Sequence, residues 1–312
     1  MSGHVLLTGA YPYTEEQIRK IRELGWQVTF VQDEREPLCI PADTFDAVVC
    51  NNLFLYNDIA DFTNLKIVQA TSAGLDRLPL KYMEQHHILY YNAKGVYSIP
   101  MAEWTVMSIL EIYKDSYGFF QKQQKKSWDK NRSLLELTGR KVCIIGYGDV
   151  GREIAKRLAG FGTEITAVNR NRVEDSQIFR WVPLDRMDEI LPEEDIVILS
   201  IALTDETRGL MNAARLAEMK TGSVLVNVSR GAIIDENALV QELKQGKFRG
   251  AALDVFETEP LPAESELWGM PGVIIGPHNS FVGDKVKERM FSLIYRNLEK
   301  MLKDTVWVIG GQ

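Results

Sequence analysis

The stretch Lys141-Val142-Cys143-Ile144-Ile145-Gly146-Tyr147-Gly148-Asp149-Val150-Gly151 decides the fold of this chain. It begins as an apolar strand pattern and ends as a GxGxxG motif, and a helical pattern follows over Arg152–Ala159. The motif alone is weak evidence, but a strand before it and a helix after it are the context that dinucleotide binding requires. The first glycine would allow a tight turn, the second a close approach of a pyrophosphate, and the third close packing of helix on strand. The sequence therefore predicts a dinucleotide loop rather than an ordinary glycine turn.

Short apolar segments recur on both sides of this motif. Before it, strands are expected at His4–Thr8, Gln27–Val31, Asp46–Cys50, Lys66–Ala70 and Ile88–Tyr91. From the motif onward, strands are expected at Lys141–Ile145, Glu164–Asn169, Ile196–Ser200, Val224–Val228, Gly250–Asp254 and Val273–Ile275. Helical segments separate them, and this alternation is typical of parallel sheets in an α/β protein.

The helices carry recognisable start and stop signals. Thr14 can cap the first helix, and Gly25 can end it in the left-handed conformation. One uninterrupted helix is expected over Ser98–Phe120, and others over Asn212–Lys220 and from about Asp284 to Lys303.

The composition indicates a globular chain, and 312 residues fit about two domains at ~150 residues each. A formal charge of −7 argues against a nucleic-acid or membrane-surface partner. The longest uncharged apolar run, Ile196–Leu203, is far shorter than the ~20 residues of a membrane helix, and Met1–Gly9 has no basic segment typical of a signal peptide. Cys39, Cys50 and Cys143 are expected to be buried thiols without disulfides, which indicates a reducing, cytoplasmic location.

The choice of dinucleotide depends on the end of the strand expected at Glu164–Asn169, the second strand from the glycine motif onward. An NAD site usually places Asp or Glu there to bind the ribose 2′-OH, whereas this chain has Asn169-Arg170-Asn171-Arg172. Guanidinium groups suit a 2′-phosphate, so the sequence favours NADP(H). The alternative is that Arg170 and Arg172 are solvated and that Glu174 or Asp175 binds the ribose, in which case NAD(H) would serve.

Three charged residues follow three successive strands. Arg230 follows Val224–Val228, Glu259 follows Gly250–Asp254, and His278 follows Val273–Ile275. Ligands bind beyond the carboxyl ends of the strands in a doubly wound sheet, so these side chains form a candidate site beside the nucleotide loop. The other histidines, His4, His86 and His87, are expected to be surface or core residues.

The chain resembles the D-isomer-specific 2-hydroxyacid dehydrogenases. The matching stretches are Gly146–Gly151, Leu203–Leu210, Asn227–Asp235, Gly250–Pro260 and Pro277-His278, and they span most of Leu137–Phe281. The N-terminal part matches more weakly, through Ala73-Gly74-Leu75-Asp76 and Ala102-Glu103.

The resemblance implies an α/β fold of two Rossmann-like or flavodoxin-like domains, each a doubly wound parallel sheet. The cofactor domain would be inserted in the catalytic domain. Residues 1–97 and 284–312 would form the catalytic, substrate-binding domain, and residues 98–283 the NAD(P)-binding domain.

The resemblance also implies the role of each site residue. Arg230 would bind the carboxylate and carbonyl of a small 2-oxo acid, and His278 would be the acid–base residue. Glu259 would stabilise the imidazolium, with Glu257 as the second candidate. Backbone N–H groups of Ala73, Gly74 and Leu75 would hold the substrate carboxylate. The expected cofactor-binding residues are Gly146, Tyr147, Gly148, Asp149, Val150, Gly151, Asn169, Arg170, Arg172, Ser200, Thr207, Val228 and Asp254, and no metal site is expected.

Some positions depart from the family pattern. Phe281 stands where small residues are common, and Trp104 replaces the usual histidine after Glu103, as an expected core change. The expected substrate-facing loop Asn51–Tyr56 carries no Lys or Arg, which counts against a phosphorylated substrate. Pro277 stands where enzymes acting on formate usually have Gln, which counts against formate or phosphite as substrate.

Two expectations concern the whole protein. The apolar face of the helix predicted over Ser98–Phe120 and the family resemblance predict a homodimer, in which Trp128 could reach the partner's active site. The main prediction is a reductase of small 2-oxo acids. The alternative is a dinucleotide-sensing interaction protein, since the same family contains transcriptional corepressors that keep the three charged residues.

Overall fold

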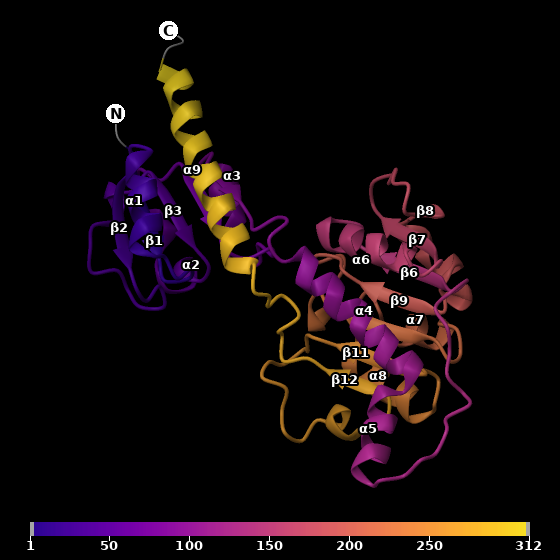
Figure 1. Cartoon of the computed structure of the whole chain (residues 1–312). Coiled ribbons are helices and arrows are strands. Elements are labelled where there is room, and N and C mark those ends of the chain that lie inside the picture. Colours follow the sequence, from indigo (N-terminus) through magenta and orange to yellow (C-terminus); the bar gives the residue numbers. More distant parts are fainter. Residues whose placement is uncertain (1–2, 310–312) are drawn as a thin grey trace. The chain divides into compact units, whose positions relative to one another are not determined.

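The computed structural model describes the backbone of residues 3–309 and the side chains as far as Lys303. The chain divides into two compact units, Met1–Tyr97 with Gly283–Gln312, and Ser98–Val282 (Figure 1). In sequence, the second unit is inserted between the two segments of the first. Whether the units serve as substrate and cofactor domains stays a prediction.

The first unit is built on a sheet of five parallel strands in the order β2-β1-β3-β4-β5. These are β1 His4–Thr8, β2 Gln27–Val31, β3 Ala47–Cys50, β4 Ile67–Ala70 and β5 Leu89–Tyr91. Its helices are α1 Glu15–Glu23, α2 Leu53–Tyr56, α3 Leu80–Gln85 and α9 Val286–Ile309.

Alternate strand residues point to opposite faces of this sheet. Val5 lies in a buried cluster with Ile21 of α1 and Ile294 of α9, whereas Leu6 lies in a second cluster with Met83 of α3. Helices therefore cover both faces, which is the doubly wound arrangement.

The second unit contains a sheet of seven parallel strands in the order β12-β11-β10-β9-β6-β7-β8. The strands are β6 Lys141–Ile145, β7 Glu164–Asn169, β8 Arg180–Pro183, β9 Ile196–Leu199, β10 Val224–Asn227, β11 Gly250–Leu253 and β12 Val273–Ile275. The helices are α4 Ser98–Lys114, α5 Ser116–Gln124, α6 Asp149–Ala159, α7 Ala213–Glu218 and α8 Glu236–Lys244.

Two apolar layers hold this sheet. Ile109 of α4 and Ile154 of α6 pack in one buried cluster, and Leu216 of α7 and Leu239 of α8 pack in the other. The strand order reverses between β6 and β9, so the glycine loop after β6 lies at a topological switch point. The predicted fold class is confirmed in both units.

Two predictions about local structure are wrong, and one strand was not predicted. The helix expected over Ser98–Phe120 is broken at Asp115, whose left-handed backbone (φ 52°) separates α4 from α5. Asp tolerates this conformation better than most residues, and its carboxylate accepts a hydrogen bond from Asn131 at 2.7 Å. Strand β8 was not predicted, because its four half-buried residues at the sheet edge form no apolar run. Cys39 is exposed, although Cys50 and Cys143 are buried as expected and all three are free thiols.

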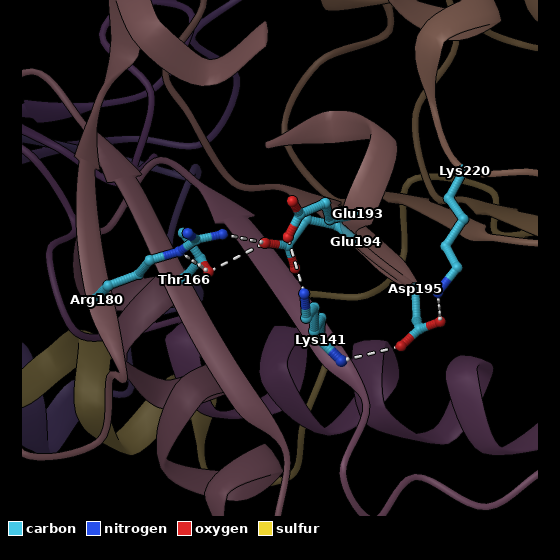
Figure 2. A network of polar contacts seen from close by, with 7 residues as sticks. All are labelled: Lys141, Thr166, Arg180, Glu193, Glu194, Asp195 and Lys220. Carbon is cyan, nitrogen blue, oxygen red and sulfur yellow. Dashed lines mark hydrogen bonds and ion pairs between the residues drawn. The ribbon is translucent and has the colours of Figure 1, made fainter. Parts of the chain in front are cut away.

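A polar network joins the amino-terminal ends of several strands of the second sheet (Figure 2). Asp195 accepts hydrogen bonds from the backbone of Lys141 at 3.1 Å and from Nζ of Lys220 at 2.7 Å. Glu194 is fully buried, and its Oε1 accepts from Thr166 at 3.0 Å and from Arg180 at 3.4 Å. The network lies at the edge opposite to the strand ends that carry Arg230, Glu259 and His278.

The sequence predicts neither a membrane-spanning helix nor a metal site, and the described residues bear on both expectations. Within them, no helix combines the length and apolar character needed to cross a membrane. The same residues contain no group of His, Cys, Asp and Glu side chains placed to bind a metal ion.

Candidate active site

The structure requires glycine at two of the three positions of the glycine loop and leaves the third open. Gly146 has φ +91°, and a Cβ there would lie 2.5 Å from the backbone of Ile201. A Cβ at Gly151 would lie 2.4 Å from the carbonyl oxygen of Gly146, so this glycine lets α6 approach β6. Gly148, the N-cap of α6, faces open space and leaves the helix without a side-chain cap. An exposed backbone beside an uncapped helix start fits an incoming pyrophosphate.

Other residues of the predicted cofactor set shape the loops around this turn. Ser200 Oγ donates to the carbonyl oxygen of Gly146 at 2.6 Å. The Thr207 hydroxyl is buried and donates to the carbonyl oxygen of Ala202 at 2.7 Å. The side chains of Tyr147 and Val228 lie in the apolar core, which leaves only their backbone to face a ligand. Asp149 and Val150 are half-buried in the first turn of α6.

The segment after β7 presents two exposed arginines, each paired with a glutamate. Arg170 forms an ion pair with Glu206, and Arg172 Nε lies 3.4 Å from Glu174 Oε1. Asn169 donates its amide to the carbonyl oxygen of Asn171 at 3.1 Å, which closes the turn.

The carboxylate of Asp175 faces helix α6. Its Oδ2 accepts from Arg152 at 2.8 Å, and its Oδ1 accepts from the backbone of Gln177 at 2.9 Å. Asp175 is therefore already occupied, which weakens its candidacy as the ribose-binding carboxylate of an NAD site.

Two of the three charged residues at the strand ends meet directly. His278 Nδ1 lies 2.7 Å from Oε2 of Glu259, and Oε1 of the same carboxylate accepts from the backbone of Phe256 at 3.1 Å. The His278 and Glu259 side chains are 34% and 36% exposed, so both reach solvent. Glu257, the second candidate, instead accepts from the backbone of Glu236 at 3.4 Å.

A buried aspartate holds the segment that carries the histidine. Asp254 is 1% exposed, and its two oxygens accept from the backbone N–H groups of Asn279 at 2.8 Å and Ser280 at 2.9 Å. The backbone N–H of His278 donates to the Asp254 carbonyl oxygen at 2.8 Å, with His278 in the left-handed region at φ 52°. Asp254, predicted to lie against the cofactor, thus has its carboxylate oxygens engaged by this loop.

The loop that carries Arg230 is fixed by the strand residue Asn227. Its Oδ1 accepts from the backbone and hydroxyl of Ser229 at 3.0 and 2.9 Å, and its Nδ2 donates to the carbonyl oxygen of Arg230 at 3.0 Å. A Cβ at Gly231 would lie 1.8 Å from the backbone carbon of Phe256, so the loops after β10 and β11 touch. Neighbouring strands therefore bring the loops of Arg230, Glu259 and His278 together at one edge.

Two of the departures from the family pattern, Phe281 and Trp104, lie next to this edge. The ring of Phe281 stands edge-on to the imidazole of His278, with centroids 6.1 Å apart. Trp104 packs against the apolar core of the second unit and lies beside Gly276, as a core change should.

The predicted carboxylate-binding loop belongs to the first unit and follows β4. The carbonyl oxygens of Ala73 and Gly74 accept from Asn92 at 2.8 Å and from Ser72 at 2.7 Å. Among the described residues, no hydrogen bond uses the N–H groups of Ala73, Gly74 or Leu75 as donors. These N–H groups are what an anion would need. A hollow of about 450 Å³ in the same unit, lined by residues from Leu38 to Thr63, contains none of the predicted site residues.

Comparison with known proteins identifies the family. The family model described as "D-isomer specific 2-hydroxyacid dehydrogenase, NAD binding domain" matches residues 106–280, which is 175 of the 312 residues. The chain belongs to the D-isomer-specific 2-hydroxyacid dehydrogenase family. As a member, it is an NAD(P)-dependent oxidoreductase acting on 2-hydroxy or 2-oxo acids.

Relatives and solved structures agree with this membership. The dehydrogenase is 33% identical over 298 residues to the glyoxylate reductase of Thermofilum pendens, covering 94% of this chain and 82% of the relative. It matches a D-isomer-specific 2-hydroxyacid dehydrogenase from Xanthobacter autotrophicus Py2, solved with NADPH and MES, with a TM-score of 0.81 and 25% identity. That alignment covers 97% of this chain and 96% of the other.

A third match shares the fold. It is a D-lactate dehydrogenase from Aquifex aeolicus, solved with NAD and lactic acid, with a TM-score of 0.79, 24% identity and coverage of 99% and 98%. Solved structures of this fold thus hold NADPH in one case and NAD in another.

Sequence reasoning did not foresee which side chains hold the site loops, since Asn227 was not singled out and Asp254 was expected only as a cofactor-binding residue. Asn227 and Asp254 are buried polar residues at the ends of β10 and β11. Asn227 binds the backbone of Arg230, 3 residues further on, whereas Asp254 binds the backbone of Asn279, 25 residues further on. The signal was present in the sequence, because a polar residue that ends an otherwise apolar strand must find hydrogen-bond partners when buried.

Proposed function

We propose that this dehydrogenase reduces a small, unphosphorylated 2-oxo acid at C2, with NADPH as the preferred hydride donor. The nucleotide, when bound, supplies the hydride that attacks C2. The protein supplies a proton for the C2 oxygen, and the product is a D-2-hydroxy acid. The observation that carries the proposal is the 2.7 Å contact between His278 and Glu259 at the strand ends beside the dinucleotide loop.

His278 serves as the acid–base residue. Its Nδ1 faces Glu259, so Nε2 remains as the ring nitrogen that can donate to the substrate oxygen. When Nε2 gives up its proton, Nδ1–H stays bonded to the carboxylate, which fixes the tautomer needed for the reverse step. Glu259 stabilises the protonated ring and holds its orientation.

Arg230 binds the substrate carboxylate and the carbonyl oxygen. A guanidinium fork suits two oxygens at once, and it stabilises the negative charge that develops on the C2 oxygen during hydride transfer. Asn227 holds the loop of Arg230, and this loop packs against the loop of Glu259. The backbone that carries the guanidinium is therefore fixed.

The cofactor preference rests on the segment after β7. Arg170 and Arg172 are exposed and can turn to a 2′-phosphate, and Asn169 does not repel it. Asp175 is engaged by Arg152, which supports NADPH over NADH.

The substrate carboxylate is assigned to the N–H groups of Ala73, Gly74 and Leu75. The segment Asn51–Tyr56 at the same edge of the first sheet has no basic residue, which supports a substrate without a phosphate group. The alternative of a dinucleotide-sensing interaction protein finds no support among the relatives, since those described above are named as enzymes.

The test is a steady-state panel of glyoxylate, hydroxypyruvate and phenylpyruvate with NADPH and with NADH. We expect reduction of at least one acid by the wild type and a loss of about 10²–10⁴ in kcat for His278→Gln, the range for general acid–base residues. His87→Gln, in the exposed turn that follows α3, is the matched control and should retain activity. A wild type inactive with every acid and both nucleotides would refute the proposal.

A further inference from the structure

A buried carboxylate in the first unit has no part in the chemistry described so far. Glu34 follows β2 and is 5% exposed. It lies at the carboxyl end of the sheet, between Thr8, the last residue of β1, and the segment that follows β3. This is the edge that also carries the loop Ala73–Leu75 after β4.

Its contacts are all with hydrogen-bond donors. Oε2 accepts from the hydroxyl of Thr8 at 2.6 Å and from the backbone N–H of Asn51 at 3.0 Å. Oε1 accepts from the backbone N–H of Asn52 at 2.5 Å. Among the described residues, no lysine or arginine forms an ion pair with it. Because a buried charge is costly unless hydrogen-bonded, these donors are what make the position tolerable.

A carboxylate is the side chain that this position requires. It only accepts, and three donors converge on it. Glutamine would turn an NH₂ group toward at least one of those donors and leave both groups unpaired.

The segment held by Glu34 runs directly into the exposed side chains of α2. Leu53 is fully buried and fixes the segment from beneath, whereas Leu55 and Tyr56 are 58% and 51% exposed. The backbone N–H of Thr71 donates to the carbonyl oxygen of Cys50 at 2.9 Å, so the segment after β3 lies beside the segment that leads to Ala73.

We propose that Glu34 is a positioning residue for substrate binding, which fixes Asn51–Tyr56 beside the loop that takes the substrate carboxylate. The proposal rests on the proposed function, because it assigns this edge to the 2-oxo acid. Glu34 touches neither substrate nor cofactor. It acts through the backbone of Asn51 and Asn52, and therefore on substrate binding and not on nucleotide binding.

The experiment compares Glu34→Gln with two other variants. Thr8→Val removes one donor and keeps the two backbone contacts, so it gives a graded and milder change. Glu194→Gln alters another buried carboxylate, in the second unit, and controls for a general loss of stability. For each variant, KM for the 2-oxo acid, KM for NADPH and amide hydrogen exchange at Asn51 and Asn52 are measured in the full-length protein.

We expect Glu34→Gln to raise KM for the 2-oxo acid by about tenfold or more, as supporting residues of binding sites typically do. KM for NADPH should stay close to the wild-type value, and exchange at Asn51 and Asn52 should accelerate. Thr8→Val should shift the same quantities less, and Glu194→Gln should shift none of them selectively.

Three results would overturn the proposal. The first is unchanged exchange at Asn51 and Asn52 in Glu34→Gln, and the second is faster exchange with an unchanged KM for the 2-oxo acid. The third is a parallel rise of both KM values. If Glu34→Gln does not fold, Thr8→Val decides by the same criteria. Failure of the proposed function is distinct, since the wild type itself would then reduce no 2-oxo acid.

Discussion

Single buried polar side chains fix the loops at the functional edges of both sheets. Glu34 holds the segment after β3, Asn227 the loop after β10, and Asp254 the loop after β12. Each side chain binds backbone groups, so the loop conformation depends on one buried residue. Substitutions at these three positions are expected to alter catalysis through geometry.

Arg230 is the residue whose loss should cost most in substrate recognition. Arg230→Ala removes a charged, forked hydrogen-bond donor, worth about 1.5–3 kcal/mol, so kcat/KM for a 2-oxo acid should fall about ten- to a hundredfold or more. Arg186→Ala, at an exposed arginine paired with Glu189, is the control. A folded Arg230→Ala enzyme with near-normal kcat/KM would remove Arg230 from the site.

The proposed preference for NADPH rests on Arg170 and Arg172. We expect NADPH to be favoured over NADH at least about tenfold in kcat/KM, since a charge-assisted contact is worth ~1.5–3 kcal/mol and exposure reduces this value. Replacing both residues by Ala should raise KM for NADPH far more than KM for NADH, and the preference should shrink as salt rises.

The matched control for this pair is the double replacement of Arg19 and Arg22 on α1, which removes the same charge elsewhere. An unchanged ratio of the two KM values in the Arg170/Arg172 variant would mean that both arginines are only solvated. Glu206→Gln offers a converse test, because it frees Arg170 from its ion pair and should lower KM for NADPH.

The sequence was sufficient to place Arg230, Glu259 and His278 at one edge of the sheet, because each follows an apolar strand within a few residues, and their roles stay predictions. It was not sufficient to find Asn227 or Glu34. Their roles depend on which backbone groups lie opposite them, and Glu34 binds Thr8 and Asn52, which are 26 residues before and 18 residues after it. The pairing of His278 with Glu259 rather than Glu257 was likewise a matter of geometry that spacing left open.

At the scale of the elements, Glu194, which lies just before β9, should make the free energy of unfolding depend on pH. Burial raises the pKa of Glu194, opposed by its hydrogen bond with Thr166 and the charge of Arg180. In the unfolded chain Glu194 has the ordinary pKa of glutamate. At a pH between that pKa and the raised pKa of the folded state, the folded protein therefore holds a proton on Glu194 that the unfolded chain has lost. This contribution is fully present below the ordinary pKa of glutamate and is lost as pH rises through the raised one.

Glu194→Gln should remove that dependence. We expect the free energy of unfolding of the wild type, relative to the variant, to be larger at pH 5 than at pH 8, measured by chemical denaturation. Glu193→Gln alters the neighbouring exposed carboxylate and should leave the difference small. A wild-type advantage that grows with pH would show that Glu194 is charged in the folded protein.

The elements themselves followed from the sequence to different degrees. Buried strands such as β6 and β7 have the predicted bounds, because a short apolar run between polar segments is seldom compatible with anything but a buried strand. Strand β8 and the break at Asp115 did not follow from the sequence. An edge strand is defined by the neighbour it pairs with, and a left-handed residue inside a helical pattern leaves the apolar rhythm intact.

At the scale of the whole molecule, the exposed apolar residues of the second unit predict an interface with a second copy of this chain. Exposed apolar side chains occur on α4, on α5 and in the segment after α5, namely Met107, Tyr117, Phe119, Phe120 and Trp128. We expect a homodimer at micromolar concentration, checked by sedimentation. The double variant Tyr117→Glu and Phe120→Glu should be a monomer. The control variant Phe179→Glu, at another exposed aromatic residue, should remain a dimer. A monomeric wild type would exclude this interface.

The insertion of the second unit also dictates the order in which the chain becomes complete during synthesis. Val5 and Trp26 share one core with Met290, Ile294 and Leu298 of α9, and Trp26 Nε1 donates to the carbonyl oxygen of Leu298 at 3.2 Å. The ribosome makes α9 only after the whole inserted unit, so one face of the earliest sheet stays uncovered while that unit is made and folds. The second unit is therefore complete before the first, and the core of the unit that emerged first is covered only once α9 has been made.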